Sequence, residues 1–235
     1  TSYIDRWIGM GHRISYHADV GGTGQPSLQQ LRSDLDSYKA SVDALGVDTV
    51  DVVSGICSRG PWVDASIAAG FELACGIVEY CLTSLDPANL PPDKQDVANC
   101  AGPADCHGQA LNDLSKALHP WFASDSSNWL EPDPDGRLAI LVSMGGIVVP
   151  CIAEGETQSG CTADDGDVAA FAAEIEQASL YTENPAPTVL VHSWSIGSRV
   201  EQAFAEAFFA AADEAVSAGR ARWIDLGELP ARIPR

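Results

Sequence analysis

Hydrophobic residues recur at steps of three and four positions between residues 28 and 45, which predicts an amphipathic helix. The apolar positions of this stretch are Leu28, Leu31, Leu35, Tyr38, Val42 and Leu45. Ser27 and Gln30 form a capping-box pair in front of them, and Gly46 stands where the helix should stop. The segment 27–45 is therefore expected to be a helix with one apolar face.

Short apolar runs alternate with helical stretches along the rest of the chain. Strands are expected at residues 49–53, 74–80, 138–142, 147–149, 188–192 and 222–226. Helices are expected at residues 63–69, 167–180 and 198–218, with some helix around 109–118. Strands that alternate with helices predict an α/β fold with a mostly parallel sheet or barrel.

Residues 83 to about 135 break this alternation, because they are rich in proline, aspartate, asparagine and serine. Such a stretch is typical of a long insertion between regular elements. We therefore expect residues 1–235 to form a single domain that carries an insertion at about 83–135.

The formal net charge of −20 argues against some partners. Nucleic acids and anionic membranes repel such a surface, and the chain contains only three lysines. A polyanionic substrate is disfavoured for the same reason, so a neutral or cationic glycan suits the chain better. No apolar run is long enough to span a membrane.

The spacing of the seven cysteines predicts disulfides, because two pairs close short polar loops. These pairs are Cys100–Cys106 and Cys151–Cys161. Cys75 and Cys81 are able to form a third pair, which leaves Cys57 without a mate. Disulfides form in an oxidising compartment, so a secreted or extracytoplasmic protein is expected.

Reactive groups of parallel α/β folds follow the carboxyl ends of strands, and His17 and Asp19 lie in such a place. They are two residues apart and therefore on one side of an extended segment, where they are able to share a metal ion. His12, five positions before His17, falls on a different face. The alternative is a buried, hydrogen-bonded histidine beside a loop aspartate.

Two further segments follow predicted strands. The loop after strand 49–53 contains Arg59 and Trp62, and a guanidinium with an indole suits a sugar that stacks on the ring and receives hydrogen bonds. The alternative is a structural turn with Trp62 packed on the core. His192 and Trp194 follow strand 188–191, but Ser195 cannot be the serine of an α/β-hydrolase, because no histidine comes after it.

These segments together resemble the NodB-like polysaccharide deacetylases. Residues 11–17, Gly-His-Arg-Ile-Ser-Tyr-His, are similar to the family's GHEIGNH stretch. The loop at 59–62 with residues 68–71 resembles its Arg-Pro motif, and residues 187–192 resemble its strand that ends Leu-x-His. The motifs occur in the family's order, and the resemblance covers about residues 4–80 and 185–230.

The resemblance implies a distorted (β/α)-barrel hydrolase that removes acetyl groups from an acetylated glycan with a divalent metal, usually zinc. It implies that His17 is a metal ligand and that His192 is the acid toward the leaving group. The family's second metal histidine corresponds to Gly21 here, so Asp19 is the candidate to replace it. Trp194, Arg59 and Trp62 are expected on the rim of the same cleft.

One part of the family pattern has no counterpart in this chain. The family's first strand, with its Asp-Asp pair, should precede residue 4, so we expect a fragment, or a strand supplied by another chain or segment, or a degenerate site. An unpaired Cys57 agrees with such a partner. Two other functions stay open, a non-catalytic glycan-binding module on the same fold and a glycoside hydrolase that uses Asp64 and Glu79.

Overall fold

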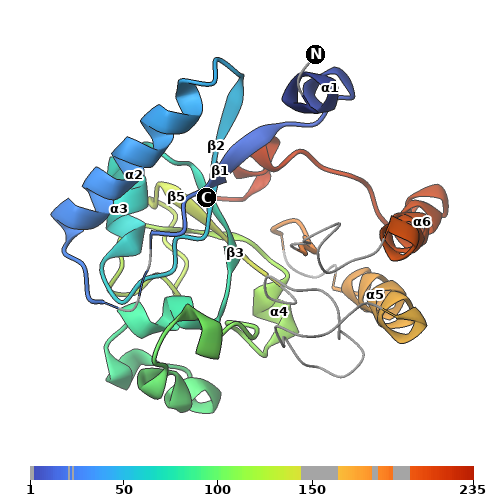
Figure 1. Ribbon diagram of the computed structural model, residues 1–235. Coiled ribbons are helices and arrows are strands. Elements are labelled where there is room, and N and C mark those ends of the chain that lie inside the picture. The colour runs from blue at the N-terminus through green and yellow to red at the C-terminus, as the bar shows by residue number, and fades with distance from the viewer. Residues whose placement is uncertain (1–2, 21, 23, 144–163, 182–184, 193–201) are drawn as a thin grey trace.

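The computed structural model describes residues 3–20, 22, 24–143, 164–181, 185–192 and 202–235, and a mostly parallel sheet forms its centre (Figure 1). The strands of this sheet are β1 (Ile14–His17), β2 (Thr49–Ser54), β3 (Leu73–Ile77), β4 (Trp121–Ala123) and β5 (Leu138–Val142). Their order is β1-β2-β3-β5-β4, and only β4, at one edge, runs antiparallel to its neighbour. The predicted α/β class and the mostly parallel sheet are confirmed. The closed barrel stays a prediction.

Helices cover the sheet and form a separate pair beside it. They are α1 (Tyr3–Gly9), α2 (Leu28–Asp43), α3 (Trp62–Ala68), α4 (Leu114–Ala117), α5 (Asp165–Ala178) and α6 (Gln202–Ser217). Figure 1 shows α2 and α3 together on one side, and α5 and α6 together on the other. The predicted helix at 27–45 is confirmed as α2, and the Ser27 hydroxyl accepts a hydrogen bond from the Gln30 backbone N–H at 3.2 Å.

The two faces of the sheet bury different sets of residues, as the alternation of side chains along a strand requires. One face contributes Val53 and Ala74 to a cluster that also contains Leu35 of α2. The opposite face contributes Val52 and Leu73. That second face is covered by residues of two segments without strand structure, 189–191 and 224–233: Val189, Val191, Ile224, Leu226, Leu229 and Ile233.

The expected strands at 188–192 and 222–226 are therefore wrong, although both segments are apolar. Neither has strand pairing, and the Val189 backbone N–H donates to the carbonyl of Leu118 at 2.8 Å. These segments lie on a face of the sheet, where apolar side chains are buried without a ladder of hydrogen bonds. The expected strand at 147–149 lies outside the described residues.

The pairing of Cys81 also corrects the sequence-based expectation. Cys81 forms a disulfide with Cys57, and Cys75 is free. The loops after β2 and β3 leave the sheet at the same edge, because these strands are parallel neighbours, and this brings Cys57 to Cys81. Cys75 lies within β3 and packs on the second face. Because Cys57 is paired within the chain, it gives no support for a missing partner.

The region at 83–135 is built mainly from short elements. The 3-10 helices in and next to it are Glu79–Ser84, Pro87–Asn89, Pro92–Asn99 and Pro103–Asp105. The predicted disulfide Cys100–Cys106 is confirmed here, whereas Cys151 and Cys161 lie outside the described residues. Within the described part, no helix is long and apolar enough to cross a membrane.

Candidate functional site

His17 and Ser54 meet at the carboxyl edge of the parallel sheet. They are the last residues of β1 and β2, and the strand register places them opposite each other. The Nδ1 atom of His17 lies 2.9 Å from the hydroxyl of Ser54. This contact orients the imidazole and leaves Nε2 for another partner, as in histidines that transfer protons or bind metals.

The turn after β2 is shaped to fit this imidazole. Gly55 has a φ of 68°, and a Cβ atom there would lie 3.0 Å from Cε1 of His17 and 2.8 Å from the backbone nitrogen of Asp19. A side chain at position 55 would therefore displace the ring or the following backbone. Asp19 itself has a φ of 44°, a left-handed conformation that aspartate tolerates better than most residues.

His107, in the insertion, is close enough to Asp19 for this carboxylate to act on its imidazole. Burial lowers the pKa of His107, and the nearby Asp19 carboxylate acts in the opposite direction. Its Nδ1 atom is buried without a hydrogen-bond partner. The imidazole of His107 is consequently neutral near pH 7, although a carboxylate lies close to it.

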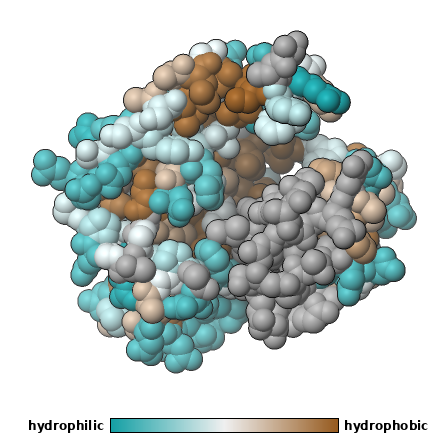
Figure 2. Space-filling model, in the orientation of Figure 1, coloured by the Kyte–Doolittle hydropathy of each residue, from teal (hydrophilic) through white to brown (hydrophobic). Residues whose placement is uncertain are grey.

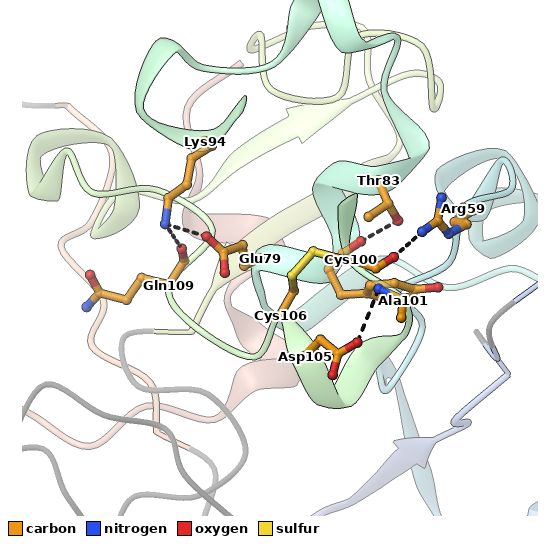
Figure 3. The surroundings of a disulfide bond; sticks show 10 residues. Arg59, Glu79, Thr83, Lys94, Cys100, Ala101, Asp105, Cys106 and Gln109 are labelled. Carbon is orange, nitrogen blue, oxygen red and sulfur yellow. Dashed lines mark hydrogen bonds and ion pairs between the residues drawn. A yellow bond between two sulfur atoms is a disulfide. The ribbon is translucent and has the colours of Figure 1, made fainter. Parts of the chain in front are cut away.

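The backbone around His107 is attached to the segment that follows β3. The N–H of Glu79 donates to the carbonyl of Gly108, and the N–H of Tyr80 donates to the carbonyl of Cys106, each at 2.9 Å. Figure 3 shows Lys94 between Glu79 and Gln109, and its ammonium lies 3.0 Å from the Glu79 carboxylate. Because Lys94 is 8% exposed, removal of Glu79 would leave a buried ammonium without its counter-charge, so the pair links the insertion to the segment after β3.

We call His17, Asp19, Ser54 and His107 the carboxyl-edge cluster. It combines two imidazoles, a carboxylate and a hydroxyl, which are the groups of general acid–base chemistry. Among the described residues, no three His, Cys, Asp or Glu side chains are grouped so as to hold a metal ion. The metal roles of His17 and Asp19, and the zinc ion itself, stay predictions.

His192 lies in different surroundings from those of the cluster. Its Nε2 atom is 2.8 Å from the Glu174 carboxylate of α5, and its ring packs edge-on against Phe171. The side chain is only 4% exposed, and its Nδ1 atom is buried without a partner. His192 borders a cavity of about 720 Å³ beside α5 and α6, whose lining includes neither His17 nor Asp19.

The side chains expected on the rim of the cleft have other partners. Figure 3 shows the Arg59 guanidinium donating to the carbonyl of Cys100, which ties the loop after β2 to the insertion. Trp62 is completely buried, its ring packs on Trp129, and its Nε1–H donates to Ser84 at 3.1 Å. Because Trp62 begins α3 and points into the core, it takes the structural alternative that the sequence left open.

Trp194 lies outside the described residues. The carboxylates considered for a glycoside hydrolase both have structural partners. Asp64 accepts from the backbone N–H of Ser126 at 3.0 Å, and Glu79 is paired with Lys94.

Two members of the carboxyl-edge cluster were not singled out from the sequence. Ser54 is the last residue of β2, one position beyond the strand predicted at 49–53, and its proximity to His17 depends on the pairing register. His107 lies between Cys106 and Gly108. The predicted disulfide Cys100–Cys106 was the one signal in the sequence that its loop is ordered.

The chain matches no family model, and neither a curated protein nor a solved structure is significantly similar to it. The fold and the carboxyl-edge cluster define the chain as an α/β protein with a polar site at the carboxyl edge of its sheet.

Proposed function

We propose that this chain is a hydrolase that removes acetyl groups from an acetylated glycan. The observation that carries the proposal is the contact between His17 and Ser54 at the carboxyl ends of neighbouring parallel strands, beside Asp19 and His107. In parallel α/β folds, the carboxyl edge is where reactive groups gather.

Each side chain of the cluster has a part in the proposal. His17, held at Nδ1 by Ser54, transfers protons during cleavage of the acetyl group. His107 is neutral near pH 7 and offers a hydrogen-bonding nitrogen to the substrate. Asp19 favours the protonated form of His107, against the larger effect of burial, because opposite charges attract.

The nature of the substrate follows from charge, compartment and resemblance. A net charge of −20 favours a neutral or cationic glycan over a polyanion. The disulfides agree with an extracytoplasmic location, where structural polysaccharides are found. The resemblance of residues 11–17 to a deacetylase motif supports an acetyl group as the part that is removed.

Zinc would supply a Lewis acid for the acetyl carbonyl and an activated water. A catalytic zinc ion usually has three protein ligands, and within the described residues no three His, Cys, Asp or Glu side chains, those of the carboxyl-edge cluster included, are grouped so as to hold a metal ion. The described side chains therefore do not fit the ion by themselves, and no step is assigned to it.

The experiment that tests the proposal measures acetate release from O-acetylated and N-acetylated oligosaccharides. We expect His17→Ala to lower kcat/KM by at least about 100-fold, the usual effect of losing a general acid–base. His12→Ala is the matched control, because His12 is exposed and lies outside the cluster, and it should keep full activity.

Equal activities of the two variants would contradict the proposed site. Glycan binding by the wild-type protein without any acetate release would instead favour the non-catalytic glycan-binding module.

A further inference from the structure

We propose that Ser54 is the nucleophile of the carboxyl-edge cluster and that its substrate is an acetyl ester, an O-acetylated sugar. The inference rests on the proposed function, because it concerns the same site. It goes further by naming the attacking atom, the covalent intermediate and the type of acetyl linkage.

The contact between Ser54 and His17 has the geometry of a nucleophile and its base. Their atoms Oγ and Nδ1 are 2.9 Å apart, within the range of about 2.6–3.2 Å that such pairs show. The other acceptor near this hydroxyl, the carbonyl of Tyr16, is farther away at 3.4 Å. His17 is exposed and Ser54 is partly exposed, so a substrate is able to reach both.

Several contacts hold Ser54 in place. The carbonyl of Ser54 accepts from the N–H of Ala18 at 2.9 Å, which continues the pairing of β1 and β2 beyond His17. Three residues later, Cys57 is linked to Cys81, so the turn after Ser54 is cross-linked to the segment after β3. A nucleophile on a rigid strand end needs little reorganisation before it attacks.

The reaction then proceeds in two balanced steps. The Ser54 oxygen attacks the ester carbonyl carbon while Nδ1 of His17 takes the hydroxyl proton, and the bond from that carbon to the sugar oxygen breaks. His17 returns the proton to the departing sugar oxygen, which leaves acetyl-Ser54. Water attacks this ester next, with His17 taking its proton and passing it to Ser54, so that acetate and free enzyme are formed.

The choice of an ester follows from what supports His17. Within the described residues, no contact joins its ring to a carboxylate, so the pair lacks the third member of a triad. Loss of that member lowers kcat by about 10⁴-fold in a serine protease. A pair of this kind suits an ester, whose alkoxide leaves more easily than the amine of an acetamide.

The test labels the protein with a fluorophosphonate probe, which loses fluoride when a nucleophilic serine attacks its phosphorus. Mass spectrometry should find one adduct, on Ser54, and Ser54→Ala should not react. His17→Gln should react at least about 100-fold more slowly, because it lacks the base. Ser127→Ala is the matched control, since the Ser127 hydroxyl also has a short contact, 2.6 Å to Asp125, but lies outside the cluster.

Absence of an adduct from the wild-type protein, or equal labelling of Ser54→Ala, would overturn the inference. Thermal unfolding of each variant verifies that it is folded. If Ser54→Ala keeps releasing acetate, the nucleophile is overturned while the proposed function stands. If Ser54 is labelled but no glycan loses acetate, the nucleophile is supported and the glycan substrate is overturned.

Discussion

Burial and a neighbouring carboxylate act in opposite directions on the pKa of His107. Burial lowers its pKa and Asp19 partly offsets this effect, so Asp19→Asn should lower the pKa of His107 further. Asparagine also accepts the left-handed backbone at this position. A pH titration of the imidazole by NMR measures the change. Asp105→Asn is the control, because Asp105 is an exposed carboxylate of the same insertion and should leave the pKa unchanged.

The same substitution should change how folding stability depends on pH. The pKa of His107 in the folded protein lies below its unfolded value of about 6.5, so the unfolded chain binds more protons in this range. The free energy of unfolding is therefore undiminished by His107 above about pH 6.5, and it decreases as pH falls toward the pKa of His107 in the folded protein. An unchanged His107 titration in Asp19→Asn would contradict the proximity of these two residues.

At the level of single residues, only half of the carboxyl-edge cluster could be predicted from the sequence. His17 and Asp19 were identified because they are two residues apart in an extended segment and because residues 11–17 resemble a deacetylase motif. Ser54 required the register between β1 and β2, and His107 required the fold of the insertion. Trp62 is the opposite case, since an indole after a strand fits a sugar site and a core position equally well.

Among the structural elements, the two described disulfides differ in how much of the chain they restrain. Cys57–Cys81 spans 24 positions and Cys100–Cys106 spans 6. In the loop-entropy account these separations correspond to about 3.5 and about 2.4 kcal/mol of stabilisation. We expect the Cys57→Ala/Cys81→Ala variant to have a lower Tm than the Cys100→Ala/Cys106→Ala variant, as measured by calorimetry.

Cys75→Ala serves as the reference for this comparison, because Cys75 is a free thiol whose pKa burial raises to about 12. It removes a sulfur without opening a loop. A lower Tm for the Cys100→Ala/Cys106→Ala variant than for the Cys57→Ala/Cys81→Ala variant would contradict the entropic explanation.

Elements with strong local signals could be predicted, whereas elements that depend on pairing could not. The helix α2 was predictable because its apolar stripe and its Ser27 cap lie within one segment. The segments 188–192 and 222–226 were mistaken for strands because apolar side chains indicate burial but not hydrogen-bonded partners. Similarly, the mate of Cys81 depended on which loops leave the sheet at the same edge.

On the scale of the whole molecule, two histidines that were expected in one cleft have different environments. His17 lies at the carboxyl edge of the sheet, whereas the ring of His192 is hydrogen-bonded to the Glu174 carboxylate of α5. Outside the grey residues, the face drawn in Figure 2 is mainly hydrophilic, with hydrophobic residues gathered by β2 and in a smaller patch over α2 and α3. The exposed apolar side chains of the first residues are Tyr3, Trp7, Ile8 and Met10. The site that we propose lies at the carboxyl edge of the sheet and is polar. It is distinct from the apolar cavity beside α5 and α6, which His192 borders.

The histidines allow the central claim, that the glycan is bound and cleaved at the carboxyl edge, to be tested in one NMR measurement. The chain has five of them as reporters: His12, His17, His107, His119 and His192. An N-acetylated oligosaccharide is titrated into the wild-type protein as a slowly cleaved analogue, and the imidazole signals are followed. Binding at the carboxyl edge should shift the signals of His17 and His107 and leave those of the other three unchanged. Shifts of His192 with unchanged His17 and His107 would contradict the central claim.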